Sequence, residues 1–247
     1  MRALLVSDLH YDLRKLDWVL AEASNVDLLA VAGDVLDIAS GVPLDAQIAV
    51  VLEYLARFAE RTTTVACSGN HDLDTRTDGD EKATQWITEA RRHGVTVDGD
   101  SVDVGGWLVS ACAWWEGPET LARLDATLDQ AAALRQGRPW MWVYHGPPEG
   151  PLSWTGTKHY GDPELPRLLD RHHPDLVLCG HIHQAPFVEG GAWHEQRGST
   201  TLFNSGYQRG QRPAHVFLDL DEGAASWWSF EGTGDVSFAR PGAASAQ

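Results

Sequence analysis

The sequence predicts an α/β fold in which short buried strands alternate with helices. Two observations support this prediction. Short apolar runs rich in Val, Leu and aromatic residues recur along the chain, and segments with a helical spacing of apolar residues separate them. The chain has 247 residues, 43% of them hydrophobic, which is enough to bury a substantial core. Alternation of this kind is typical of sheets that are covered by helices.

The elements follow in order from these patterns. Strands are predicted over residues 2–6, 27–32, 63–67, 107–111, 140–144, 175–179, 200–203 and 215–220. Helices are predicted over residues 13–23, 44–60, 81–92, 118–135 and 163–171. Asp162 followed by Pro163 opens the last helix, as an N-cap with proline in the first helical position.

The later part of the chain is rich in strands. Residues 95–111 and 200–230 therefore predict a second sheet within the same domain. We expect a single domain over residues 1–237. The remaining residues, 238–247, are rich in Gly, Ala and Ser and are expected to form a disordered tail.

Composition excludes several classes of partner. The 19 Lys and Arg residues against 35 Asp and Glu residues give a net charge of −16, which disfavours binding to bulk nucleic acid. The longest apolar stretches, residues 28–32 and 48–52, are too short to cross a bilayer, so no membrane partner is expected. No signal peptide is expected, because Ser7 and Asp8 interrupt the first apolar run. Three cysteines cannot all pair, which favours a reducing cytoplasm.

Polar clusters follow six of the predicted strands. In open α/β sheets, ligands bind beyond the carboxyl ends of the strands, so clusters far apart in sequence are expected to converge at one edge. The clusters are Ser7-Asp8-Leu9-His10, Gly33-Asp34, Ser68-Gly69-Asn70-His71-Asp72, His145-Gly146, Gly180-His181-Ile182-His183 and Asn204-Ser205-Gly206.

Seven side chains of these clusters supply candidate oxygen or nitrogen ligands, and none of them is a thiolate. A structural zinc site needs four ligands and favours cysteine. Seven mixed donors instead suit two divalent ions that share one carboxylate, as in two-metal hydrolases, and the donor types suit Mn, Fe or Zn. The candidate metal ligands are Asp8, His10, Asp34, Asn70, His145, His181 and His183.

These blocks form an ordered pattern: D-x-H at 8–10, GD at 33–34, GNH followed by Asp at 69–72, His145, and GHxH at 180–183. In this pattern the sequence resembles the calcineurin-like metallophosphoesterase family. The resemblance implies a four-layer α/β/β/α sandwich of two mixed sheets flanked by helices. It also implies a phosphoric ester hydrolase whose nucleophile is a hydroxide bridging two metal ions.

The same resemblance assigns roles to individual residues. Asp8, His10, Asp34 and His183 would hold one metal ion; Asp34, Asn70, His145 and His181 would hold the other, with Asp34 as the bridge. His71 would be the catalytic histidine that protonates the leaving oxygen. Asp37, three residues after the bridging carboxylate, would orient His71, and Asp72 is the competing candidate for a supporting role.

Departures from the family pattern narrow the activity. Residues 38–40, which follow Asp37, are Ile-Ala-Ser rather than beginning with the Arg-Gly typical of Ser/Thr protein phosphatases, and His71 stands where lipid-A-precursor pyrophosphatases have arginine. The clusters at 7–10 and 69–72 look most like the small class III cyclic-nucleotide phosphodiesterases. A small phosphodiester substrate is therefore expected. The alternatives are a phosphomonoesterase, a nucleotide pyrophosphatase, or a non-catalytic scaffold of the same fold.

The segment between His145 and the last predicted helix is unusually long. Residues 146–161 are rich in Pro and Gly, and long ordered loops are often functional. We hypothesise that Trp154, Lys158 and His159 contact the substrate, with Trp154 against a ring and Lys158 against phosphate. A packing role for this loop is the alternative.

Overall fold

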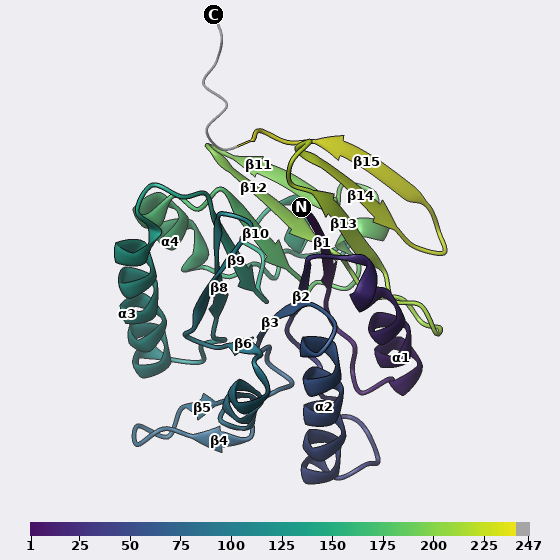
Figure 1. Cartoon of the computed structure of the whole chain (residues 1–247), viewed down its shortest axis with the longest axis vertical. Helices are drawn as coiled ribbons and strands as arrows, with labels where there is room; N and C mark the ends of the chain where they lie inside the picture. Colours follow the sequence, from purple (N-terminus) through teal and green to yellow (C-terminus); the bar gives the residue numbers. More distant parts are fainter. Residues whose placement is uncertain (241–247) are drawn as a thin grey trace, which may run out of the picture.

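The computed structural model describes residues 1–240 and consists of two mixed sheets packed face to face between helices (Figure 1). The first sheet is parallel on one side of its centre and antiparallel on the other. Its strands, in spatial order, are β15 (Thr233–Ser237), β14 (Ala224–Trp228), β13 (His215–Asp219), β1 (Arg2–Val6), β2 (Leu28–Ala32), β3 (Thr63–Cys67) and β6 (Thr96–Val97). Strands β1, β2, β3 and β6 run parallel, and β13–β15 are antiparallel additions.

The second sheet has four parallel strands with one antiparallel strand at each edge. In spatial order it contains β11 (His194–Arg197), β12 (Thr200–Asn204), β10 (Leu176–Cys179), β9 (Trp140–Tyr144), β8 (Trp107–Cys112) and β7 (Ser101–Val104). A separate two-stranded ribbon pairs β4 (Thr75–Arg76) with β5 (Lys82–Ala83).

Alternating side chains along each strand build the layers. In β1, Leu4 and Val6 pack toward the helices, whereas Ala3 and Leu5 pack between the two sheets. A strand buried on both faces needs apolar residues at every position, which is why these strands read as continuous apolar runs. The four-layer α/β/β/α arrangement predicted from the sequence is confirmed.

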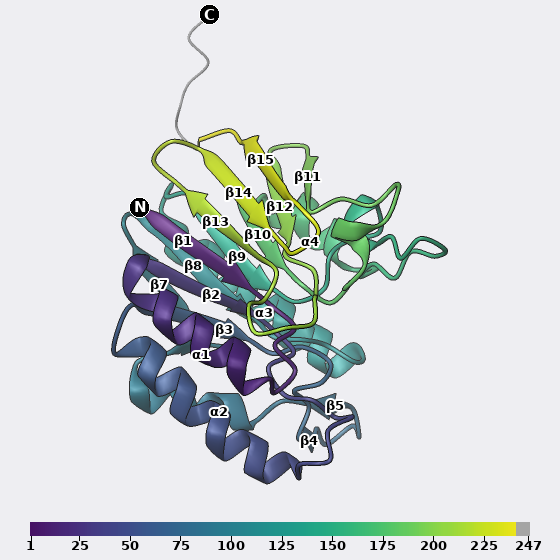
Figure 2. The same cartoon turned by 90° about the vertical axis from the view of Figure 1, so that its right-hand side faces the viewer.

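Four α-helices cover the outer faces of the sheets (Figures 1 and 2). Helices α1 (Leu13–Glu22) and α2 (Leu44–Ala59) cover the first sheet, and α3 (Pro118–Arg135) and α4 (Leu165–His172) cover the second. Asp162 accepts hydrogen bonds from the backbone N–H groups of Glu164 and Leu165 at 2.7 and 3.0 Å, so α4 begins two residues after the predicted start. Short 3-10 helices complete the structure: η1 (Ala23–Asn25), η2 (Trp86–His93), η3 (Pro151–Ser153) and η4 (Ala185–Phe187).

Two predictions about elements were wrong. Residues 81–92 do not form an α-helix: Lys82 and Ala83 pair with β4, and only Trp86–His93 are helical, as 3-10 helix η2. The Glu81 carboxylate instead accepts the N–H groups of Glu119 and Thr120 at the start of α3, a contact that local spacing does not show. Residues 200–230 also do not share one sheet, because β12 joins the second sheet while β13 and β14 extend the first.

The ordered chain continues past the predicted domain boundary at residue 237. Phe238 is buried against the core between the sheets, and its N–H donates to the Gly223 carbonyl at 2.7 Å. The domain therefore includes Phe238, and residues 241–247 of the predicted tail lie outside the described residues.

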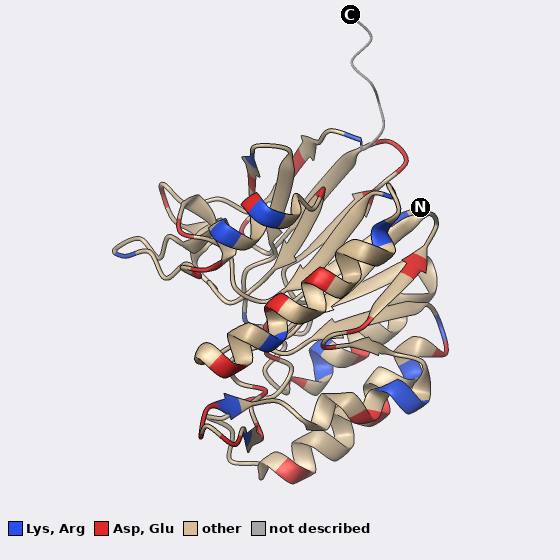
Figure 3. Cartoon of the chain, turned by 90° about the vertical axis from the view of Figure 1, so that its left-hand side faces the viewer, with Lys and Arg blue, Asp and Glu red and all other residues tan. Residues whose placement is uncertain are grey.

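Hydropathy and charge along the described residues bear on the expected partners. Among residues 1–240, no helix combines the length and hydropathy needed to cross a bilayer. On the face in Figure 3, Lys and Arg residues are scattered among acidic ones. The three cysteines, Cys67, Cys112 and Cys179, are buried and unpaired.

Candidate metal centre

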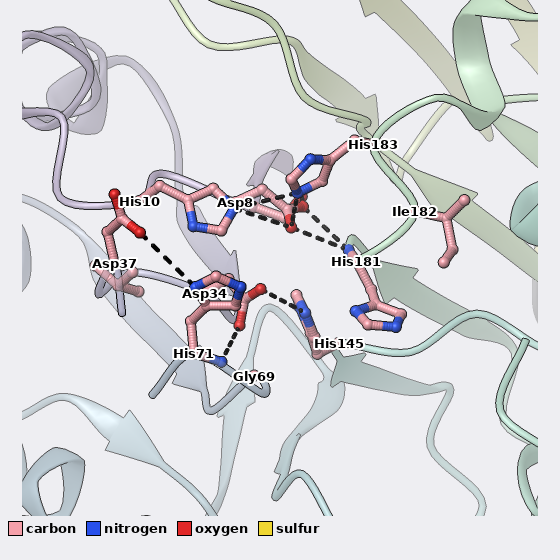
Figure 4. Close-up of polar contacts among 12 residues, drawn as sticks. Asp8, His10, Asp34, Asp37, Gly69, His71, His145, His181, Ile182 and His183 are labelled. Atoms are coloured by element: carbon pink, nitrogen blue, oxygen red, sulfur yellow. Dashed lines mark hydrogen bonds and ion pairs between the residues drawn. The ribbon is translucent and has the colours of Figure 1, made fainter. Parts of the chain in front are cut away.

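The predicted ligands meet at the carboxyl edge of the parallel strands (Figure 4). Asp8 and His10 follow β1, Asp34 follows β2, and Asn70 follows β3. His145 follows β9, while His181 and His183 follow β10, so both sheets contribute. In Figure 4, the Ile182 side chain points away from the predicted ligands, whereas His181 and His183 on either side of it belong to them.

The donor atoms form overlapping groups that are small enough to hold cations. One group contains Asp8, His10 and His183, and another contains Asp34, His145 and His181; within each group the donor atoms lie within 4.8 Å of one another. These two groups correspond to the two predicted metal sites. A third group joins His10, Asp34 and His71, so the structure also places His71 within reach of a cation.

An orphaned buried donor supports a cation here. His145 Nδ1 lies 2.7 Å from the Ala32 carbonyl oxygen, which fixes the proton on Nδ1 and leaves Nε2 free to bind a metal. Asn70 Oδ1 is buried without a hydrogen-bond partner, and the nearest group to His145 Nε2 is the Asp34 carboxylate, itself a predicted ligand, at 3.2 Å. Buried polar atoms are rarely left unpaired. The donor set therefore fits a pair of divalent ions.

Burial and neighbouring charges set the protonation of the predicted ligands. Burial lowers the pKa of His181 to about 4, helped by the charge of His145, so His181 is a neutral donor at neutral pH. For Asp8, burial is outweighed by the hydrogen bond from His183 and by the neighbouring imidazoles, which hold its pKa well below the usual range. For His145, burial is likewise outweighed by Asp34, which lies 3.2 Å away and raises the pKa of His145 to about 9. Because a ligating imidazole must be neutral, metal binding displaces that proton.

Backbone strain is concentrated at the same place. Eight non-glycine residues of the described chain have a positive φ, and four of them are predicted ligands: Asp8 (53°), His10 (46°), Asp34 (52°) and His181 (69°). Each such residue costs about 1–3 kcal/mol and persists where the surroundings enforce it, typically at functional sites. This clustering is independent support for a functional centre.

Asp34 is held in position from several directions. Asp72 is fully buried and accepts the N–H groups of Asp34, Val35, Leu36 and Gly69 at 2.7–3.1 Å. Gly69 lies so close to Asp34 that a Cβ there would overlap the carboxylate. Burial, followed by the charge of Asp34, raises the pKa of Asp72 to about 7. Of the two candidate supporting carboxylates, Asp72 therefore fixes the backbone of the Asp34 loop.

The other supporting carboxylate, Asp37, lies beside the predicted catalytic histidine. His71 Nδ1 is 3.9 Å from Asp37 Oδ1, and the His71 N–H donates to Asp34 Oδ1 at 2.8 Å. The His71 side chain keeps 23% of its surface exposed, so its imidazole can meet a substrate. This geometry suits a proton donor that a nearby carboxylate orients.

Aromatic residues that the motifs did not predict flank the centre. The Trp114 ring lies 5.1 Å from that of His181, and the Tyr207 ring stacks on His183 at 4.7 Å. Trp114 also lines a pocket of about 310 Å³ beside His181, together with Trp115 and Tyr160. The position of Trp114 just after β8 could have indicated a residue of the site. No pattern in the sequence indicates that Tyr207 lies there.

The predicted substrate-contact residues belong to a loop in which Trp154 and His159 pack on each other. Trp154 packs on His159 with ring centroids 4.7 Å apart, and its indole N–H donates to the Glu189 carbonyl at 3.0 Å. Lys158 is exposed, and its carbonyl accepts the Thr155 N–H across a tight turn. Trp154, Lys158 and His159 do not line the pocket beside His181, whereas Tyr160 of the same loop does.

A buried lysine lies behind Tyr207. Lys15 of α1 is only 1% exposed, and its ammonium lies 3.8 Å from the centroid of the Tyr207 ring. Burial lowers the pKa of Lys15 to about 8, which the charges of Asp12 and Asp8 offset only in part. Lys15 thus packs against the ring that stacks on His183, and this packing buries a cation.

Lys15→Met is expected to change how stability depends on pH. In the wild type the pKa of Lys15 is about 8 when folded and 10.5 when unfolded, so the unfolded chain binds more protons between these values. The contribution of Lys15 to the free energy of unfolding therefore rises by about 3 kcal/mol between pH 8 and pH 10.5. The variant should be more stable than the wild type below pH 8, and this advantage should shrink toward pH 10.5. Urea unfolding of the wild type and the variant at several pH values, with a chelator present, measures this difference in stability. Lys82→Met, at an exposed lysine, is the control. A stability difference between wild type and Lys15→Met that does not vary with pH would contradict the prediction.

Comparison with known proteins identifies the family. The family model described as calcineurin-like phosphoesterase matches residues 1–185. No curated protein matches the chain. Among solved structures, TT1561 of Thermus thermophilus is similar at 18% identity and a TM-score of 0.57, covering 96% of this chain and 98% of its own. The GAP50 anchor of the Plasmodium inner membrane complex is similar at 9% identity and a TM-score of 0.54, and the match covers 98% of this chain and 90% of GAP50. These likenesses show the fold, and the family match goes further: the chain belongs to the calcineurin-like phosphoesterase family.

Proposed function

We propose that the protein is a dinuclear metal-dependent hydrolase of small phosphodiesters. The observation that carries this proposal is the pair of donor groups, Asp8-His10-His183 and Asp34-His145-His181, which a third group containing His10 and Asp34 connects. Asn70 Oδ1 is buried and unpaired beside them. Two divalent cations bound there would stabilise charge on the phosphoryl oxygens and supply a hydroxide nucleophile near neutral pH.

The chain's own residues perform the remaining tasks. Asp8, His10 and His183 would hold one ion, and Asn70, His145 and His181 the other, with Asp34 between them. His71 would donate a proton to the departing ester oxygen, and Asp37 would orient its imidazole. Asp72 keeps Asp34 in place through backbone hydrogen bonds.

Space beside the centre favours diesters over monoesters. A phosphodiester carries two organic groups on phosphorus, whereas a monoester carries one. The centre has a pocket of about 310 Å³ beside His181 and a groove of about 590 Å³ beside His183. Each volume falls within the range of small-molecule sites, and His181 and His183 belong to different donor groups. Each organic group of a diester would thus have its own site.

Turnover of model substrates tests this proposal. Bis-p-nitrophenyl phosphate and p-nitrophenyl phosphate should be compared after loading with Mn²⁺, Fe²⁺ or Zn²⁺, alongside elemental analysis of the protein. We expect two metal ions per chain, loss of activity with a chelator, and a higher kcat/KM for the diester. Faster turnover of the monoester would favour a phosphomonoesterase. Two bound metals without turnover of either ester would favour the non-catalytic scaffold.

A further inference from the structure

A groove beside His183 is larger than the pocket beside His181. Its volume is about 590 Å³, and Phe187, Tyr207, Arg209, Phe230 and Glu231 are among the residues that line it. His183 forms one of its walls and keeps a third of its side chain exposed. His183 thus belongs both to a predicted metal-ligand group and to the wall of the groove.

Hydrogen bonds connect the walls of the groove. The Tyr207 N–H donates to the His183 carbonyl at 3.2 Å, which ties the β12–β13 loop to the metal-ligand loop. The Gln208 side chain accepts the Phe230 N–H at 2.8 Å and donates to the Arg212 carbonyl at 2.8 Å. These contacts hold the β12–β13 loop against the turn between β14 and β15. The groove is thus a preformed site, which limits the ordering that a ligand must bring about.

The lining combines apolar rings with one cation. Phe187, Tyr207 and Phe230 offer ring surfaces, and Phe230 exposes 62% of its area although it is a large apolar residue. Arg209 is the one basic residue of the lining, and within residues 1–240 it forms no ion pair. Its guanidinium therefore stays available to an anionic ligand, in a chain whose net charge is −16. Its fork of N–H donors suits a carboxylate or phosphate.

We propose that this groove is a subsite for an ester group that carries a ring and a second negative charge. Such a substrate places its scissile phosphodiester at the metal centre, its ring against Phe230 and the edge of Tyr207, and its second anionic group on Arg209. This inference rests on the proposed function and adds the substrate class: diesters with an anionic ring-bearing arm. Glu231, on the same lining, would repel a misplaced anion and so favour one orientation.

A matched pair of substrates tests the subsite. The probes are 4-carboxybenzyl and 4-methylbenzyl p-nitrophenyl phosphate, which share a leaving group and differ in one carboxylate. We expect a lower KM for the carboxylated diester. Arg209→Gln should raise that KM roughly 10-fold, the size expected for one charge-assisted hydrogen bond at a partly solvated site, and should change the KM of the methyl diester far less. Glu231→Gln should lower the KM of the carboxylated diester.

Controls separate this inference from a general loss of charge. Arg61→Gln removes one positive charge from an exposed residue after α2, just before β3 and thus at the opposite edge of the sheet, and should not change either KM. Equal KM values for the two probes in the wild type, unaffected by Arg209→Gln, would overturn the subsite. So would a groove that buries a second copy of the chain, which would appear in sedimentation as a dimer that Phe230→Ser dissociates.

Binding without turnover distinguishes the two proposals. Phosphonate analogues, with a methylene group in place of the leaving oxygen, can be titrated calorimetrically into the metal-loaded protein. A roughly 10-fold preference for the carboxylated analogue that Arg209→Gln removes would support the subsite even if no diester is hydrolysed. Absence of any preference in an enzyme that hydrolyses both diesters would reject the subsite and leave the proposed function standing.

Discussion

Asp34→Ala is expected to abolish hydrolysis and to release at least one metal ion. Asp34 belongs to two of the three donor groups, and its carboxylate also accepts the His71 N–H. Removal of a carboxylate shared by two sites removes a ligand from both. Metal content by mass spectrometry and kcat on bis-p-nitrophenyl phosphate measure the effect. Wild-type metal content in the variant would show that Asp34 does not bridge the ions.

Two further variants separate the lost ligand from a damaged fold. Asp34 has a φ of 52°, a conformation that asparagine tolerates better than alanine, so Asp34→Asn removes the charge with less strain. It should also lose metal and activity. Asp37→Asn changes a carboxylate of the same loop that belongs to no donor group, and it should keep both ions while lowering kcat by about 10–100-fold.

His71→Asn is expected to keep both metal ions while lowering kcat by about 10²–10⁴-fold, the usual contribution of a positioned general acid. His71 Nδ1 is buried without a hydrogen-bond partner and faces Asp37 at 3.9 Å. The defect should be smaller for p-nitrophenyl diesters than for alkyl diesters, because p-nitrophenolate departs with little need for a proton. Kinetics on both substrate types, with metal analysis, measure it.

His181→Asn is the matched control for that variant. His181 lies in the donor group of Asp34 and His145, and asparagine tolerates its φ of 69°, so this change should reduce metal affinity. The third donor group, of His10, Asp34 and His71, gives the opposing hypothesis that His71 is itself a ligand. Equal metal loss in the two variants, or a kcat defect that does not depend on the leaving group, would favour that hypothesis.

The sequence predicted the parts of the molecule that depend on local pattern. The boundaries of the eight predicted strands came within one residue because buried apolar runs such as Leu28–Ala32 and Trp140–Tyr144 mark them in the sequence. The convergence of Asp8, Asp34, His145 and His181 followed from the rule that parallel strands end at one edge.

Residues whose position depends on distant contacts were not predictable in the same way. Glu81 lies in a helical pattern, but its carboxylate caps α3 from 38 residues away, so the predicted helix was wrong. Tyr207 and Lys15 meet only after β13 places the β12–β13 loop next to α1. The aromatic residues of the 146–161 loop looked alike in the sequence, yet Tyr160 lines the pocket while Trp154 packs on its neighbour.

At Asp8, His10, Asp34 and His181 the left-handed backbone lowers the stability of the fold, while the side chains are those that the proposed activity needs. Glycine adopts that conformation without steric cost, whereas a side chain there costs about 1–3 kcal/mol. Selection for heat resistance alone would therefore drive these four positions toward glycine and dismantle the centre. A library screened for melting temperature would enrich inactive proteins, and stabilising mutations in this protein should be sought away from these turns, with activity screened at the same time.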